Sequence, residues 1–293
     1  MSLPTIFTKF PEGWKINIAK PIDEAVFYLN NHFKGFFDAI KAGLLALLDS
    51  VGNILTAIPW WLMMLIVFVV GWRSSKNILK GLTYSLMLFL VGLLGLWDLM
   101  NVTLSIVIVS VIISLIIGLP IGILNSMSRN AEGIAKLILD AMQTMPTFVY
   151  LIPAVMFFGL GRVPAVIATT IYATPPAIRF TSLAINQVDK EMVEAARSFG
   201  ATRSQLLSKV QIPQAVPTIM AGINQTTMMA VSMVVTCAMI GASGLGMEVL
   251  TSINRIEVGR GFTSGLAVVV IAVIMDRLTQ GWFGKNHVRE EGK

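Results

Sequence analysis

Long uninterrupted apolar runs constrain this chain more than any other feature. Residues 61–72 read WLMMLIVFVVGW, and residues 103–124 read TLSIVIVSVIISLIIGLPIGIL. A helix of about 20 apolar residues crosses the roughly 30 Å hydrocarbon layer of a bilayer. With 55% hydrophobic and only 13% charged residues, the chain has too few polar side chains to cover such segments in water. The sequence therefore predicts an all-α, polytopic membrane protein.

Hydropathy indicates about seven crossings of the membrane. The predicted crossings are residues 54–72, 81–97, 101–125, 137–159, 164–185, 213–241 and 262–283. Lys and Arg gather in alternate loops, and positively charged loops remain in the cytoplasm. The cytoplasmic set is Arg73, Lys76, Lys80, Arg129, Lys136, Lys190, Arg197, Arg203, Lys209, Lys285, Arg289 and Lys293. We therefore expect the N-terminus outside and the C-terminus inside.

The formal net charge of +6 follows from this topology, and it does not indicate a nucleic-acid partner. Residues 1–50 carry five Lys and five acidic residues, so they form no basic arm. The first 20 residues contain no apolar segment of the kind found in a cleavable signal peptide. We divide the chain into an external N-terminal arm (1–50), a transmembrane domain (51–285) and a cytoplasmic tail (286–293).

The N-terminal arm contains a candidate amphipathic helix. Apolar residues recur at helical spacing from Ile22 to Leu48, and charged and amide side chains stand between them. This pattern is typical of a helix that lies in the membrane interface, here on the outer side. A helix packed on the flank of the bundle would show the same pattern.

The chain offers no cluster suited to catalysis or metal binding. His32 and His287 lie in the arm and the tail, and the single Cys237 lies within a crossing. The phosphate-binding pattern G-x-x-x-x-G-K-S/T does not occur. Asp140 and Asp276 fall within about two turns of a crossing end, so no central carboxylate of the kind used by ion-coupled carriers is present. We expect no enzyme activity and no metal or cofactor on this chain.

The charged stretch from Val193 to Pro213 has the pattern of a helical elbow. Met192, Ala195, Ala196 and Phe199 share one helical face. Gly200 can then end the helix in the left-handed conformation. Thr202 and Gln205 have the spacing of a capping box that begins a second short helix carrying Leu206 and Leu207, and Pro213 suits the first turn of the next crossing. The elbow presents a small apolar patch that would fit a groove on another protein.

The same stretch resembles the EAA loop of permease subunits in binding-protein-dependent ABC importers. The family pattern is E-A-A, three residues, G, nine residues and I-x-L-P. Glu194, Ala195, Ala196 and Gly200 match it outright, nine residues follow, and Pro213 matches its end. Val210 and Ile212 are conservative departures from the Ile and Leu of the pattern, and Phe199 lies beside the motif. The resemblance implies that residues 186–213 form the loop that couples this chain to a separate ATPase, which would bind ATP and Mg²⁺.

A narrower resemblance extends over residues 50–283. The segments MQTMPTFVYLIPAVMFFGLGRVPAV, ATPPAIRFTSLAINQV, PTIMAGINQTTMMAVSMVV and MDRLTQ are similar to permeases of glycine betaine, proline betaine and choline importers. The resemblance implies the type I (MetI-like) permease fold in a bacterial inner membrane. It also implies a second copy of this chain, two cytoplasmic ATPase subunits and an external substrate-binding protein, and it leaves the transported solute open.

A polar stripe on the sixth crossing is the candidate pathway. Gln225, Met229, Ser232 and Thr236 share one helical face, with Asn224 beside it. Such a stripe lines either a pathway or a helix contact. The tryptophans lie near crossing ends as an interfacial belt, so solute selection would rest with an external partner. The alternatives are a stand-alone carrier or channel for small zwitterions, which would have no ATPase to dock, and a scaffold, which would not require the polar stripe.

Overall fold

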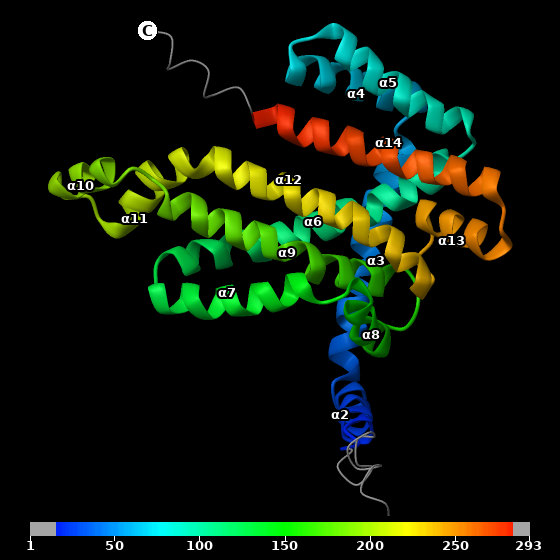
Figure 1. Cartoon of the computed structure of the whole chain (residues 1–293), viewed down its shortest axis with the longest axis horizontal. Coiled ribbons are helices and arrows are strands. Elements are labelled where there is room, and N and C mark those ends of the chain that lie inside the picture. The colour runs from blue at the N-terminus through cyan, green and yellow to red at the C-terminus, as the bar shows by residue number, and fades with distance from the viewer. Residues whose placement is uncertain (1–15, 284–293) are drawn as a thin grey trace, which may run out of the picture.

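The computed structural model describes residues 16–283, and all regular secondary structure in this range is helical (Figure 1). The prediction of an all-α chain is confirmed. The predictions for the first 15 residues, for His287 and for the tail at 286–293 concern residues outside the described range.

Three long helices form the centre of the bundle: α6 (Trp97–Ser126), α9 (Arg162–Asn186) and α12 (Ile212–Thr236). They lie side by side in Figure 1, and small residues permit their close approach. A Cβ atom added to Gly118 would lie 2.6 Å from the Cβ of Ala177, and one added to Gly122 would lie 2.6 Å from that of Thr181. The backbone of α6 therefore packs directly on α9.

Hydroxyl groups on α6 form hydrogen bonds to backbone carbonyls of α9 across this contact. Ser110 Oγ donates a hydrogen bond to the carbonyl of Val166 at 3.4 Å, and Ser114 Oγ donates to that of Thr170 at 3.1 Å. Such interhelical bonds stabilise helix pairs where water is absent. The polar character of the crossing predicted at 164–185 thus reflects its position in the middle of the bundle.

A second layer packs on this centre through α14 (Val258–Phe283). In Figure 1, α14 lies between α12 and the hairpin of α4 (Trp60–Ser75) and α5 (Ile78–Leu93). Leu88 and Val91 of α5 share one buried cluster with Ile271 and Ile274 of α14. Asn77 caps α5 by accepting a hydrogen bond from the backbone N–H of Leu79 at 2.9 Å. α13 (Leu245–Arg255) joins α12 to α14 at the opposite end from this turn.

The crossing predicted at residues 137–159 is wrong as a single helix. α7 (Arg129–Thr144) and α8 (Thr147–Phe158) meet at 95°. Pro146 disfavours the helical conformation at Met145 and supplies no backbone N–H to continue α7. Across the bend, Tyr150 Oη donates a hydrogen bond to the carbonyl of Met142. Hydropathy does not register the bend because it averages α7 and α8 together as one segment.

The N-terminal segment also differs from the sequence-based boundaries. It forms α2 (Ala19–His32) and α3 (Lys34–Ala57), so the helix predicted over 22–48 is divided at Phe33 and continues past residue 50. Pro59 follows the end of α3 and begins α4, because its fixed φ and missing N–H interrupt the helix. The first residues of the crossing predicted at 54–72 therefore belong to α3.

α3 runs steeply across the direction of α6, α9 and α12 in Figure 1. The ring of Phe37 stacks on that of Phe157 with centroids 4.8 Å apart, and Asp49 pairs with Arg162 at 3.2 Å. Phe36, on the other flank, is 61% exposed. One side of α3 thus packs on the ends of α8 and α9, and the other side is uncovered.

Within the described residues, four helical segments are long and apolar enough to cross a bilayer: residues 34–57, 97–126, 203–240 and 258–280. A fifth is obtained if the bent pair of α7 and α8 counts as one span. α4 and α5 have 16 residues each, fewer than the usual span of about 20. The crossing predicted at 81–97 ends earlier, at Leu93, and Trp97 already begins α6.

Candidate coupling elbow and translocation face

The elbow begins with α10 (Lys190–Ser198), which is capped at both ends, and Gly200 ends it as the sequence predicts. Asp189 accepts a hydrogen bond from the backbone N–H of Glu191 at 2.9 Å. At the other end Gly200 has φ +79°, and two backbone bonds close the helix: Gly200 N–H to Arg197 O at 2.9 Å and Ala201 N–H to Ala196 O at 3.1 Å. This pair of bonds is the Schellman motif, which Gly favours because it has no Cβ.

The second half of the elbow starts with the predicted capping box. Thr202 Oγ1 accepts from the backbone N–H of Gln205 at 3.3 Å, and Gln205 Oε1 accepts from the backbone N–H of Thr202 at 2.9 Å. The helix that follows is not separate from the next crossing. α11 (Arg203–Leu206) passes through a π-helical turn (Leu207–Gln211) into α12, and the helical path continues to Ile240.

The π-helical turn explains how the chain accommodates Pro213. Pro has no N–H to complete the usual bond to the carbonyl four residues earlier. In the widened turn the backbone N–H of Ile212 bonds instead to the carbonyl of Leu207, five residues before it. Val210 and Ile212 are half-buried here, and Pro213 is exposed. The crossing predicted to begin at residue 213 is therefore continuous with the elbow.

The outer surface of α10 is apolar and uncovered. Phe199 is 92% exposed and Met192 is 50% exposed. Glu194 and Ala195 are also exposed, whereas Ala196 is half-buried. Phe199 and Met192, seven residues apart on one helical face, are thus two apolar side chains that the described chain leaves largely uncovered.

The predicted stripe on α12 is a continuous accessible face. Gln225 and Ser232 are exposed, and Met229 and Thr236 are half-buried. At the same helical spacing the face extends toward the elbow through Ala221. The amide of Gln225 would be costly on a helix surface that faces lipid. The face is therefore suited to contact with water or with another polypeptide.

Asn224 lies beside this face in a polar contact between α12 and α14. Its Nδ2 donates to Asp276 Oδ1 at 2.9 Å, and its Oδ1 accepts a hydrogen bond from Thr279 Oγ1. Gln280 Nε2 donates to the same Asp276 oxygen at 2.6 Å. Sequence reasoning missed this network because Asp276 lies near a helix end. The spacing of Asp276, Thr279 and Gln280 on one helical face was a signal that could have revealed it.

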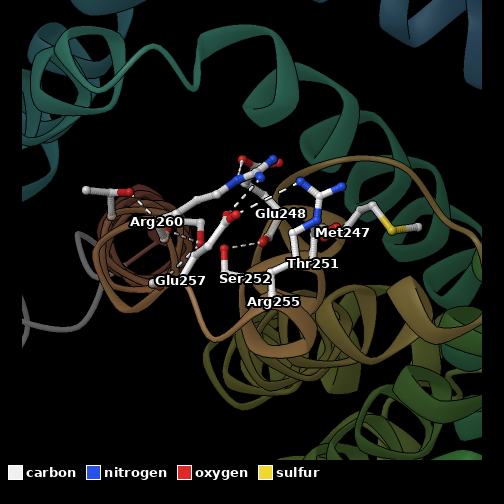
Figure 2. A network of polar contacts seen from close by, with 10 residues as sticks. Met247, Glu248, Thr251, Ser252, Arg255, Glu257 and Arg260 are labelled. Carbon is white, nitrogen blue, oxygen red and sulfur yellow. Dashed lines mark hydrogen bonds and ion pairs between the residues drawn. The ribbon is translucent and has the colours of Figure 1, made fainter.

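A second polar network lies at the far end of the bundle, where α13 meets α14 (Figure 2). Arg260 donates to Glu248 through Nε and to Glu257 Oε2 through Nη1, the latter at 3.0 Å. Between the helices Ile256 has φ +58°, an uncommon conformation for a β-branched residue. Arg255 Nη1 lies 4.0 Å from Glu257 Oε1.

The described residues contain no group of His, Cys, Asp and Glu side chains that could hold a metal ion. Cys237 is fully buried, and its sulfur lies 3.6 Å from Thr169 Oγ1. The elbow and the accessible face of α12 are instead suited to docking of a partner at one end of the bundle and to passage of a solute along α12.

Comparison with known proteins agrees with this geometry. Residues 110–282 match the family of binding-protein-dependent transport system inner membrane components. The chain is 47% identical over 274 residues to the glycine betaine/carnitine transport permease protein GbuB of Listeria monocytogenes, covering 91% of this chain and 95% of that protein. It is 45% identical over 268 residues to the glycine betaine transport system permease protein OpuAB of Bacillus subtilis, covering 91% and 94%.

Among solved structures, the chain resembles an inward-facing methionine ABC transporter, MetNI, with a TM-score of 0.53 and 26% identity. The match covers 61% of this chain and 88% of that one. The helical bundle and its elbow therefore define a membrane subunit of the ABC importer class. The chain belongs to the family of binding-protein-dependent transport system inner membrane components. Dependence on a binding protein disfavours the alternative of a stand-alone carrier.

Proposed function

We propose that this chain is the membrane-spanning subunit of an ATP-driven importer of glycine betaine or a related quaternary-ammonium osmoprotectant. Two relatives that match it over nearly their whole length are named for glycine betaine transport. The complete importer would contain a second copy of this chain, two cytoplasmic ATPase subunits that bind ATP and Mg²⁺, and an external substrate-binding protein.

The elbow is the feature that supports docking of an ATPase on this chain. Phe199 and Met192 are the apolar contacts available to a groove, and Ala195 leaves room for close approach. Glu194 and Gly200 complete the motif, the first as an exposed charge and the second as the end of α10. Val210, Ile212 and Pro213 lie where α11 continues into α12 without a break, and α10 joins α11 through the short turn at Gly200. Movement of an ATPase docked on α10 would therefore reach the membrane through this turn and α11.

Loop charge supports the proposed orientation. The elbow, the α6–α7 turn and the α4–α5 turn point toward the same side of the molecule in Figure 1. Lys76, Lys136, Arg197 and Arg203 belong to these segments, whereas α13 lies at the opposite end. By the preference of positive loops for the cytoplasm, the elbow side is internal and the N-terminus external. α2 and α3 would then lie along the outer surface of the membrane.

The exposed face of α12 supports the proposed pathway. In the inner membrane Gln225, Met229, Ser232 and Thr236 would face the second copy of the chain, and solute would pass between the two copies. This pairing would remove Gln225 and Ser232 from lipid contact, where polar side chains are costly.

Reconstitution tests the proposal. The chain, its ATPase and its binding protein are incorporated into liposomes, and uptake of labelled glycine betaine, choline, carnitine and proline is measured with and without internal ATP. We expect uptake of at least one quaternary-ammonium solute that needs both ATP and the binding protein. Uptake by the chain alone would contradict the proposal.

A further inference from the structure

A cavity of about 430 Å³ opens between α9, α12 and α14 on the elbow side of the bundle. One wall of the cavity is apolar and the other is polar. Phe180, Met220 and Ala221 form the apolar wall, and Asn224, Gln225 and Gln280 form the polar wall. The volume lies within the range of about 300–1,000 Å³ that is typical of sites for small molecules.

The polar wall is backed by a carboxylate. Asp276 accepts hydrogen bonds from Asn224 Nδ2 at 2.9 Å and from Gln280 Nε2 at 2.6 Å, and its side chain is only 19% exposed. One N–H of each amide is thus directed at Asp276, and Asn224 Oδ1 accepts a hydrogen bond from Thr279 Oγ1. The guanidinium of Arg277 lies 3.6 Å from the second oxygen of Asp276, on a side chain that is 55% exposed. The oxygen atoms near this wall thus include those of the Asp276 carboxylate, behind the amides of Asn224 and Gln280.

The position of Phe180 is fixed by its neighbour on α12. A Cβ atom added to Gly222 would lie 2.5 Å from the Cβ of Phe180, so the two helices touch at this point. The ring is held at the border of the cavity as a consequence. An aromatic face and nearby oxygen atoms are the surroundings that attract a methylated ammonium ion, which is cationic but cannot donate a hydrogen bond.

The cavity is continuous with the candidate pathway. Ala221 and Gln225 border the cavity, and at the same helical spacing Met229, Ser232 and Thr236 follow toward the far end of α12. We propose that the cavity is a transient binding site for the trimethylammonium group of the transported solute, near the inner end of its path. This inference rests on the proposed function and adds residues that contact the solute.

Protection of a cysteine tests occupancy directly. Ala221→Cys is introduced into the complete transporter, and labelling by a small thiol reagent is followed in detergent. The unsubstituted protein, whose Cys237 is buried, gives the background. Tetramethylammonium chloride should slow labelling about threefold at saturation, whereas the same concentration of ammonium chloride should not. Equal labelling rates in the two salts would overturn the proposal.

Transport by the Phe180→Leu variant provides a second test, independent of the cysteine. Losing the aromatic face should reduce betaine uptake per ATP hydrolysed by roughly three- to fivefold, and Phe180→Tyr should restore it. Phe89→Leu on α5, which removes a ring that is 37% exposed and outside the cavity, is the matched control.

An error in the proposed function and an error in the role of the cavity would give different results. If the unsubstituted complex transports no quaternary-ammonium solute, the proposed function is wrong. If it transports betaine and Phe180→Leu retains the full uptake per ATP, the function stands and the cavity has no role in passage.

Discussion

The Cβ position of Gly222 coincides with the side chain of Phe180, because an added methyl group would lie 2.5 Å from the Phe180 Cβ. Gly222 is buried where α12 crosses α9. No side chain can be added here unless the two helices separate.

Gly222→Ala should therefore destabilise the protein. Overpacking of a tight contact costs about 1–3 kcal/mol, and we expect a lower thermal midpoint in detergent. Gly265→Ala is the matched control, since a Cβ at this α14 position meets no atom within 4 Å. An equal midpoint for Gly222→Ala and Gly265→Ala would show that the helices adjust without loss.

Gly200→Val should uncouple ATP hydrolysis from uptake while the chain remains inserted in the membrane. Gly200 has φ +79°, which costs a residue with a side chain roughly 1 kcal/mol or more. A Cβ here meets no atom within 4 Å, so backbone strain and not a steric clash is the expected cause. Hydrolysis, uptake and co-purified ATPase are measured on the same preparations.

Two further variants serve as a second disruption of the elbow and as a control. Ala196→Asp places a charge beside the exposed surface of α10 and should impair coupling as well. Ser208→Ala, at an exposed position whose hydroxyl donates only to the Ser204 carbonyl, should have little effect. Wild-type transport by Gly200→Val with a full complement of ATPase would contradict the coupling role of the elbow.

The proposed orientation makes Ser204 cytoplasmic. Ser204→Cys should resist an impermeant thiol reagent in intact cells and react in inverted membrane vesicles. Cys237 is buried and should contribute little background. Labelling of intact cells would reverse the topology and remove the elbow from reach of an ATPase.

Substrate choice should follow the external binding protein. Replacing it with a relative of different specificity that still docks should change the solute carried, because selection would precede entry into the membrane. Uptake of competing labelled solutes measures the change. Unchanged preference would move the selective step into this chain.

Ile256→Gly should stabilise the turn between α13 and α14. Ile256 has φ +58° and a side chain that is 84% exposed, so its replacement relieves strain and removes little packing. The expected gain is about 1 kcal/mol, measured as a higher thermal midpoint of the isolated chain. A lower midpoint would mean that the Ile256 side chain makes a stabilising contact in the detergent-bound protein.

Local signals account for the features that sequence reasoning located well. Gly200 and the Thr202–Gln205 pair determine helix ends through contacts within a few residues, so their spacing predicts the elbow. Proline is less informative. Pro146 ends a helix, whereas Pro175 lies inside α9, where the bundle retains the helix around it.

Contacts between distant segments could not be predicted from one sequence. Asn224 and Asp276 are brought together only by the packing of α12 on α14. The position of α3 across the bundle depends likewise on Phe37 meeting Phe157. Hydropathy specifies that a segment avoids water, and it does not specify its direction or its neighbours.

The unbroken helical path from Arg203 to Ile240 has a mechanical consequence. At 1.5 Å per residue, this path is about 57 Å long. The carbonyl of Ile240 accepts a hydrogen bond from the backbone N–H of Gly161 at 3.0 Å, so the far tip is fastened to the α8–α9 turn. A continuous helix of this length moves as one body. A tilt of about 10° would displace one end by roughly 10 Å relative to the other. The second half of the elbow and the opposite end of the bundle are therefore the two ends of one continuous helical path.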